Sequence, residues 1–222
     1  TSQSLMDELY NYGYAQVDTA FWQVGDQPSN STISTKWDEG VGIVGYRGWG
    51  GPTGWSRPEF RRDEVNELKN NWQLPIVFSF VCKTGQFDYD GPCFAERLIL
   101  LGSYSLPRGA VAVIGPSEKD TDTKYNNPIY GTMMDVLLEE RVPELGPALH
   151  AGKQSLIEEF GEISASPEPG AFEGTFTEFY HYVYNVIGDP SLPVWLGMPK
   201  NLSAEFESGD TLLSSYVSAT VR

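Results

Sequence analysis

The chain contains a near-continuous apolar run at Leu74–Val81, with the sequence LPIVFSFV. Its β-branched and aromatic residues, without alternating polar positions, are typical of a strand that is buried on both faces. Two other segments read as strands: Val41–Tyr46 before this run and the glycine-bounded Gly109–Gly115 after it. We predict that these three segments belong to one sheet.

Helical patterns alternate with these strands. Asn127–Arg141 and Gly146–Phe160 have apolar residues at three- and four-residue spacing. Buried strands that alternate with helices predict an α/β fold, in which a parallel sheet is covered by helices on both faces. The other expected helices are Ser4–Tyr10, Arg62–Asn70, Cys93–Leu101 and Glu173–Tyr184; we also expect strands at Tyr14–Phe21 and Leu192–Leu196 and a polar loop at Gly25–Ser34.

The composition excludes several classes of function. The 222 residues suffice for a sizeable core, and 30 acidic against 15 basic side chains give a net charge of −15. Such a charge repels phosphate backbones, so we expect no nucleic-acid partner. No apolar run approaches the roughly 18 residues of a membrane span. The chain begins Thr-Ser-Gln without a signal peptide, and we expect it to be a processed piece of a longer protein.

Cys82 directly follows the central apolar run. Functional residues of parallel sheets lie on loops at the carboxyl ends of the strands. A glycine-containing turn there can bring backbone N–H groups toward a nucleophile. The alternative for an isolated cysteine after an apolar strand is an inert core thiol.

The surroundings of this cysteine resemble a known family. The segments Phe78–Phe87 (FSFVCKTGQF) and Gly91–Glu96 (GPCFAE) are similar to the catalytic stretch of the gingipain family of cysteine peptidases, in which the first cysteine is the nucleophile. Gly188–Ser191 (GDPS) resembles the family's exit into its immunoglobulin-like module, and the resemblance covers about residues 5–222. It implies a caspase-like, mostly parallel sheet flanked by helices, followed by the start of an immunoglobulin-like β-sandwich.

The resemblance also implies a domain organisation. Residues 1–197 would form the catalytic subdomain, and 198–222 a linker and the first strands of a truncated β-sandwich module. The expected partners are a polypeptide substrate or ligand, together with the N-terminal subdomain and the C-terminal module of the same precursor. The family's usual setting implies a secreted or cell-surface location.

One position departs from the family pattern. Gingipains carry their general base in a Tyr-x-Gly-His-Gly segment, whereas this chain has Trp49 in the histidine position of Tyr46–Gly50. Indole cannot accept a proton at neutral pH, and a thiol without a cationic partner stays mostly protonated. By resemblance, Cys82 holds the nucleophile position, and the N–H groups of Cys82 and Gly50 form the oxyanion site.

The remaining histidines do not replace the missing base in this interpretation. His150 is expected on a helix surface and His181 in an aromatic helix that packs on the sheet. We therefore expect an impaired cysteine peptidase, a pseudopeptidase acting as a structural or binding module. One alternative is an active endopeptidase that uses Cys82 with a non-standard base.

A second alternative is a glycan- or peptide-binding surface built on Trp49 and Trp55, with Arg47 able to stack on either ring. Against it stands the expectation that Trp49 plugs the former active site and Trp55 packs beneath it, since large aromatic residues are usually buried.

No cofactor is expected, although the resemblance leaves structural calcium open. The candidate ligands are Asp88 with Asp90 and Asp120 with Asp122. Calcium takes six to eight oxygens, which neither pair supplies alone, so we favour solvated acidic faces. Cys82 and Cys93 are candidates for a disulfide in an oxidising compartment.

Overall fold

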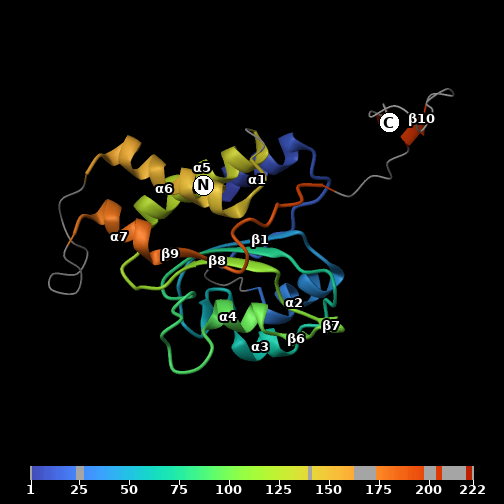
Figure 1. Cartoon of the computed structure of the whole chain (residues 1–222). Helices are drawn as coiled ribbons and strands as arrows, with labels where there is room; N and C mark the ends of the chain where they lie inside the picture. The colour runs from blue at the N-terminus through green and yellow to red at the C-terminus, as the bar shows by residue number, and fades with distance from the viewer. Residues whose placement is uncertain are drawn as a thin grey trace.

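A computed structural model describes residues 2–23, 28–139, 142–162, 174–197, 204–206 and 219–221. Its centre is a four-stranded sheet in the order β1-β5-β8-β9 (Figure 1). The strands are β1 (Ile43–Arg47), β5 (Ile76–Phe80), β8 (Ala112–Pro116) and β9 (Tyr184–Ile187). The first three are parallel and β9 runs antiparallel to β8, which confirms the predicted mostly parallel sheet.

The two inner strands are buried along their whole length, as their apolar sequences predict. Arg47, at the end of β1, pairs in register with Phe80, at the end of β5. The carboxyl ends of these two strands therefore meet at one edge of the sheet.

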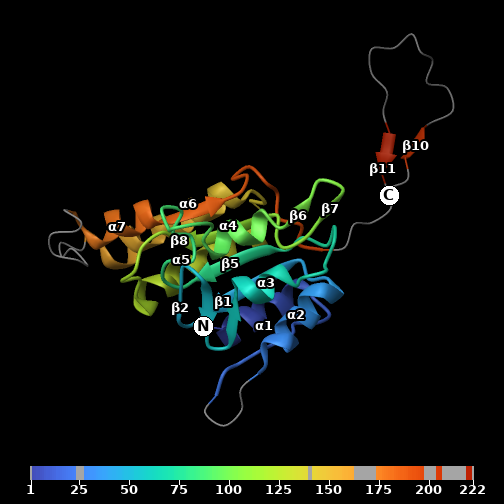
Figure 2. The same cartoon turned by 90° about the horizontal axis from the view of Figure 1, so that it is seen from below.

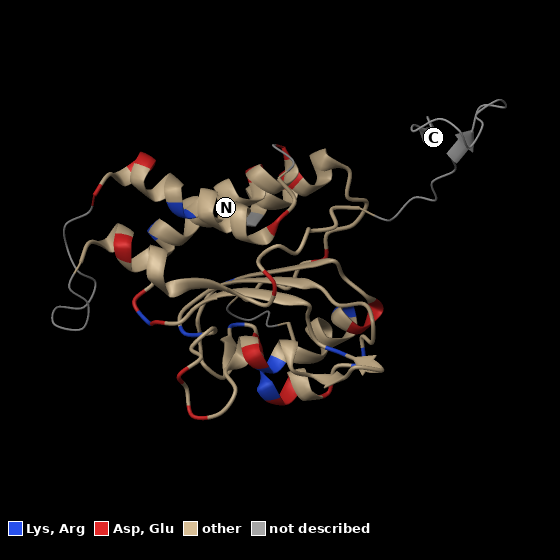
Figure 3. Cartoon of the chain, in the orientation of Figure 1, with Lys and Arg blue, Asp and Glu red and all other residues tan. Residues whose placement is uncertain are grey.

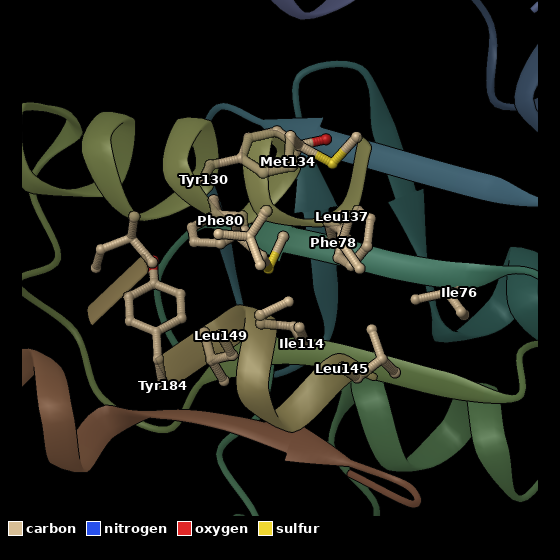
Figure 4. Close-up of a cluster of buried hydrophobic side chains, with 14 of the residues drawn as sticks. Ile76, Phe78, Phe80, Ile114, Tyr130, Met134, Leu137, Leu145, Leu149 and Tyr184 are labelled. Carbon is tan, nitrogen blue, oxygen red and sulfur yellow. The ribbon is translucent and has the colours of Figure 1, made fainter. Parts of the chain in front are cut away.

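Helices cover both faces of the sheet (Figures 1 and 2). The larger core holds Phe78 and Phe80 from the sheet together with Tyr130 and Tyr184, whose side chains gather in Figure 4. The second core, on the opposite face, is built around Trp37, Trp55 and Phe94. The helices of the first face are α1 (Ser2–Tyr12), α5 (Thr123–Leu138), α6 (Leu145–Phe160) and α7 (Phe176–Val183), and those of the second are α2 (Asn30–Glu39), α3 (Arg62–Asn66) and α4 (Phe94–Ile99).

Three small antiparallel sheets lie outside the central one among the described residues, and two of them are formed by segments between its strands. The glycine- and tryptophan-rich segment after β1 forms β2 (Gly50–Gly51) and β3 (Gly54–Ser56), which pair with each other, and β4 (Glu59–Arg61) pairs with β3. A second hairpin joins β6 (Gly102–Ser103) to β7 (Leu106–Pro107). The glycine- and tryptophan-rich segment is thus an ordered extension at the carboxyl end of β1.

Three sequence-based expectations are wrong. Tyr14–Phe21 forms no strand. Most of its residues are exposed, so its alternation of apolar and polar residues does not correspond to a buried side of a sheet. Part of the expected loop Gly25–Ser34 belongs to α2. Leu192–Leu196 does not enter the sheet because its backbone bonds to the start of α6, where Leu145 N–H donates to the Leu192 carbonyl; β9 takes the fourth place instead.

At the C-terminus, β10 (Ala204–Phe206) pairs antiparallel with β11 (Ala219–Val221). The expected linker Met198–Lys200 and residues 207–218 lie outside the described residues, so the immunoglobulin-like module stays a prediction. Within the described part of the chain, no helix is long and apolar enough to cross a membrane. Charged residues lie mainly on helices and loops, and the central strands are almost free of them (Figure 3).

Candidate active site

Cys82 lies at the carboxyl edge of the central sheet, two residues after β5, and is half-buried. The next residue, Lys83, has φ 59°, in the left-handed region that side chains other than glycine rarely adopt. Its N–H donates to the Glu118 carbonyl at 3.1 Å. The chain therefore turns sharply and keeps the thiol at the edge, where the sequence predicts a nucleophile.

The glycine of the Cys-x-x-Gly segment is required by packing. A Cβ added at Gly85 would lie 2.8 Å from the Gly115 carbonyl oxygen and 2.9 Å from Cδ1 of Ile187. The Gly85 N–H also donates to the Pro116 carbonyl at 3.0 Å. Residue 85 is thus pressed against β8 and β9, and the cysteine loop is anchored there.

A buried chain of hydrogen bonds ties this loop to the Trp55 hairpin. Trp55 Nε1–H donates to Ser79 Oγ at 2.9 Å, and Ser79 Oγ lies 2.9 Å from Thr84 Oγ1. Thr84 in turn donates to the carbonyl of Val81, the residue before the cysteine, at 3.3 Å. Sequence reasoning missed Ser79 and Thr84; the available signal was a single hydroxyl inside an otherwise apolar strand.

Trp55 is 2% exposed and stacks on Tyr46 with ring centroids 4.3 Å apart, which confirms that it packs beneath the site. Trp49 behaves differently, because its side chain is 73% exposed. Its carbonyl accepts hydrogen bonds from the Tyr46 hydroxyl and the Ser56 N–H, both at 2.8 Å. These bonds hold the backbone of Trp49 against the protein, whereas its indole points into solvent. The expectation that Trp49 plugs the site is therefore wrong.

Arg47 stacks on neither tryptophan. Among the described residues, the arginines that lie over aromatic rings are Arg57 on Trp22, at 4.8 Å, and Arg62 on Tyr89, at 5.4 Å.

Gly50 lies beside the cysteine loop. A Cβ there would be 3.2 Å from Cγ1 of Val81. Because Ser56 N–H bonds to the Trp49 carbonyl, the next pair, Gly50 with Trp55, is a non-hydrogen-bonded pair of the antiparallel ladder. The Gly50 N–H is therefore directed away from β3.

The thiol has a threonine neighbour. Cys82 Sγ lies 3.3 Å from Thr121 Oγ1 and 3.8 Å from the Thr121 carbonyl oxygen. His150 is exposed on α6, and Nδ1 of His181 lies 2.8 Å from the Thr177 carbonyl oxygen within α7. Within the described residues, no hydrogen bond joins either histidine to Cys82.

The family model of peptidase family C25 matches residues 3–195. The chain belongs to peptidase family C25. This confirms the gingipain-like cysteine peptidase domain that the residues around Cys82 indicate. It leaves the roles of Cys82, Trp49 and Gly50 as predictions.

Among curated C25 relatives, gingipain R2 of Porphyromonas gingivalis (strain ATCC BAA-308 / W83) is 28% identical over 200 residues, covering 87% of this chain and 25% of the relative. Lys-gingipain of Porphyromonas gingivalis (strain ATCC 33277) is 25% identical over 178 residues, covering 72% of this chain and 10% of the relative. The chain thus spans a quarter or less of these relatives.

The fold also matches solved structures of other proteins. The Arg-specific cysteine proteinase gingipain R aligns with a TM-score of 0.78 and 24% identity, over 92% of this chain and 44% of that one. A complex of gingipain pro- and mature domains from Porphyromonas gingivalis aligns with a TM-score of 0.76 and 24% identity, over 92% and 45%. These matches support the caspase-like architecture.

The second cysteine of this C25 chain has a structural role. Cys93 is buried at the N-cap of α4, where its N–H donates to Glu96 Oε2 at 2.9 Å. Burial, followed by the nearby Glu96 carboxylate, raises the pKa of the Cys93 thiol to about 11. Cys82 and Cys93 are both free thiols, so the candidate disulfide between them is not formed.

The candidate calcium ligands do not form a metal-binding group in the described part of the chain. Asp122 caps α5, since its Oδ1 accepts the Lys124 N–H at 2.7 Å, and Asp120 lies 3.9 Å from the Lys119 ammonium. Asp88 and Asp90 lie in the turn after Phe87. In the described part of the chain, no three His, Cys, Asp or Glu side chains form a group that could hold a metal ion.

Proposed function

We propose that this C25 domain binds polypeptide at the Cys82 edge of the sheet and hydrolyses it slowly or not at all. The observation that carries this proposal is the exposed Trp49 in the family's histidine position. Loss of a general base costs on the order of 100- to 10,000-fold in rate. Thr121, the polar neighbour of the thiol, offers a hydroxyl that is no base at neutral pH.

Features of the site support the proposed peptide binding. The thiol is half-buried rather than sealed, and the Gly50 N–H is free of the β-ladder beside it. With the Cys82 N–H, which the family resemblance adds, these groups offer donors to a peptide carbonyl.

The exposed indole of Trp49, the residue before Gly50, adds a flat apolar surface. A surface that also uses Trp55 is not supported, because Trp55 is buried. A glycan or peptide would therefore stack on Trp49 alone.

The context that we propose is a larger secreted or surface protein. Its supports are the greater length of the relatives and the existence of a pro- and mature-domain complex in the family. The N-terminal subdomain and C-terminal module of the same precursor would then be this domain's partners.

The decisive experiment is alkylation of Cys82 by iodoacetamide from pH 5 to 9 in a Cys93→Ser background. Serine is a good N-cap, so this background preserves the start of α4. We expect slow reaction that rises only above pH 8, and no cleavage of a casein substrate. Trp49→His in the same background is expected to accelerate alkylation near neutral pH. Fast reaction of the unmodified site below pH 7, with cleavage, would establish instead an active endopeptidase with a non-standard base.

A further inference from the structure

Arg47 is the one charged residue in the four described strands of the central sheet. It ends β1, pairs in register with Phe80 and is half-buried. Side chains alternate along a strand, so Arg47 shares its face with Gly45, where an added Cβ would collide with the Tyr130 hydroxyl. The guanidinium therefore lies on the aromatic face of the sheet.

This guanidinium has no acidic partner in the described part of the chain. The four ion pairs formed there involve other residues, and no carboxylate oxygen lies within 4.0 Å of Arg47. Burial lowers the pKa of Arg47, and the groups that partly offset this effect are Tyr184 and Tyr130. Burial raises the pKa of both tyrosines, so both phenols are neutral at physiological pH and do not compensate the positive charge.

Tyr184 interacts electrostatically with both Arg47 and the Cys82 thiol. The pKa of Tyr184 is raised first by burial and then by Tyr180, lowered by a hydrogen bond with Thr121, and affected further by Cys82 and by Arg47. Thr121 is also the hydrogen-bonding neighbour of Cys82 Sγ. Arg47 pairs in register with Phe80, and Cys82 follows Phe80 by two residues, so Arg47 and Cys82 lie at the same edge of the sheet.

We propose that Arg47 binds a carboxylate of the polypeptide held at the Cys82 site, so that this domain selects acidic side chains. A half-buried cation without a counter-ion is costly, and a bound carboxylate removes that cost. The planar guanidinium suits this partner, since it donates two parallel hydrogen bonds to one carboxylate. The Tyr184 hydroxyl donates to Asn126 Oδ1 at 2.7 Å, so its hydrogen is already engaged within the protein. The inference rests on the proposed peptide binding.

A pair of small reagents tests the charge directly. Iodoacetate and iodoacetamide alkylate the same thiolate and differ in one carboxylate, so the ratio of their rates at Cys82 does not depend on how much thiolate is present. In the Cys93→Ser background, we expect Arg47→Gln to lower the iodoacetate-to-iodoacetamide ratio about tenfold, the effect of one charge-assisted contact. Arg47→Lys keeps the positive charge and should retain most of the ratio. Lys83→Gln removes the charge next to the thiol and is the matched control. An unchanged ratio in Arg47→Gln, or an equal fall in Lys83→Gln, would overturn the proposal.

Peptide protection provides a second measurement on the chain without a substitution at Arg47. Acetyl-Ala-Ala-Glu-Ala-amide should protect Cys82 from iodoacetamide at about tenfold lower concentration than its Gln counterpart. Acetyl-Ala-Ala-Ala-Ala with a free carboxylate distinguishes a chain terminus from a side chain. Equal protection by the Glu and Gln peptides, or best protection by an Arg peptide, would contradict the inference. Failure of every peptide to protect would instead refute the proposed peptide binding, while the reagent ratio still decides whether Arg47 attracts a carboxylate.

Discussion

The Trp55 indole N–H donates to the Ser79 hydroxyl at 2.9 Å, inside the core between the β3 hairpin and the central strand. Both residues are almost fully buried. Through Thr84, which Ser79 contacts, this bond reaches the carbonyl that precedes Cys82. The segment that carries Trp49 and the segment that carries Cys82 are thus held by one polar network.

Removing the central hydroxyl should destabilise this network. Ser79→Ala leaves the indole N–H without a partner in a buried place, which costs about 1–3 kcal/mol. In a chain of this size we expect the melting temperature to fall by roughly 2–4 °C for each kcal/mol. Ser105→Ala, in an exposed turn, is the control and should leave the melting temperature nearly unchanged. Equal melting temperatures of the two variants would show that this hydrogen-bond network does not stabilise the fold.

Gly85 and Gly131 offer a contrasting pair. Gly85→Ala introduces a Cβ against the Gly115 carbonyl, and overpacking of this kind costs about 1–3 kcal/mol. Gly131 lies in α5 with open space around an added Cβ, so Gly131→Ala should stabilise the helix by about 0.5–1 kcal/mol. Urea denaturation measures both changes. A neutral Gly85→Ala variant would mean that the cysteine loop is not pressed on β8.

The two tryptophans of the hairpin should differ in their effect on stability. Trp55→Ala removes a buried ring that contacts Tyr46, Phe60 and Phe94, and the expected loss is about 3–5 kcal/mol. Trp49→Ala removes a mostly exposed ring and should change the free energy of unfolding by less than about 0.5 kcal/mol. A large loss in Trp49→Ala would show that the indole is packed in solution.

The pH dependence of stability should include a contribution from Glu8. Burial, followed by repulsion from Asp135 and Glu139, raises the pKa of Glu8 in the folded chain. The charged carboxylate therefore disfavours folding at neutral pH, and this penalty disappears as the pH falls below the ordinary pKa of glutamate. Glu8→Gln should raise the melting temperature at pH 7 and have little effect at pH 4. An equal effect at both pH values would contradict this origin.

Cys93 should be inert while Cys82 reacts. With a pKa of about 11, the Cys93 thiol is only about 1% ionised at pH 9, and it is also buried. Mass spectrometry after iodoacetamide treatment at pH 8.5 should find the modification on Cys82 alone. Modification of Cys93 at a comparable rate would indicate that the N-terminus of α4 opens readily.

Much of the fold could be predicted from segments whose sequence pattern reflects complete burial or a regular buried face. The strands β5 and β8 are apolar throughout, and α5 and α6 present regular apolar faces, so local sequence and tertiary burial agree. The strand β9 was missed because its residues directly continue the aromatic pattern of α7, and only pairing with β8 sets the boundary between them.

The candidate site likewise has features that the sequence predicts and features that only the fold determines. The place of Cys82 follows from the end of a buried strand. The exposure of Trp49 does not follow from its size, because hydrogen bonds to its carbonyl determine which way the ring points. Likewise, the lack of an ion pair for Arg47 among the described residues depends on which residues the fold brings opposite it, including Tyr130 and Tyr184 from distant segments.

The fold uses the carbonyl of Trp49 and leaves the indole in solvent. The local fold therefore does not depend on the side chain at this position. The side chain can be exchanged while the hairpin, the sheet edge and the cysteine loop keep their places. Side chains of different size and chemistry can therefore occupy position 49 at little cost in stability. The side chain at this position can thus be chosen for its chemistry alone, because the fold depends only on its backbone carbonyl.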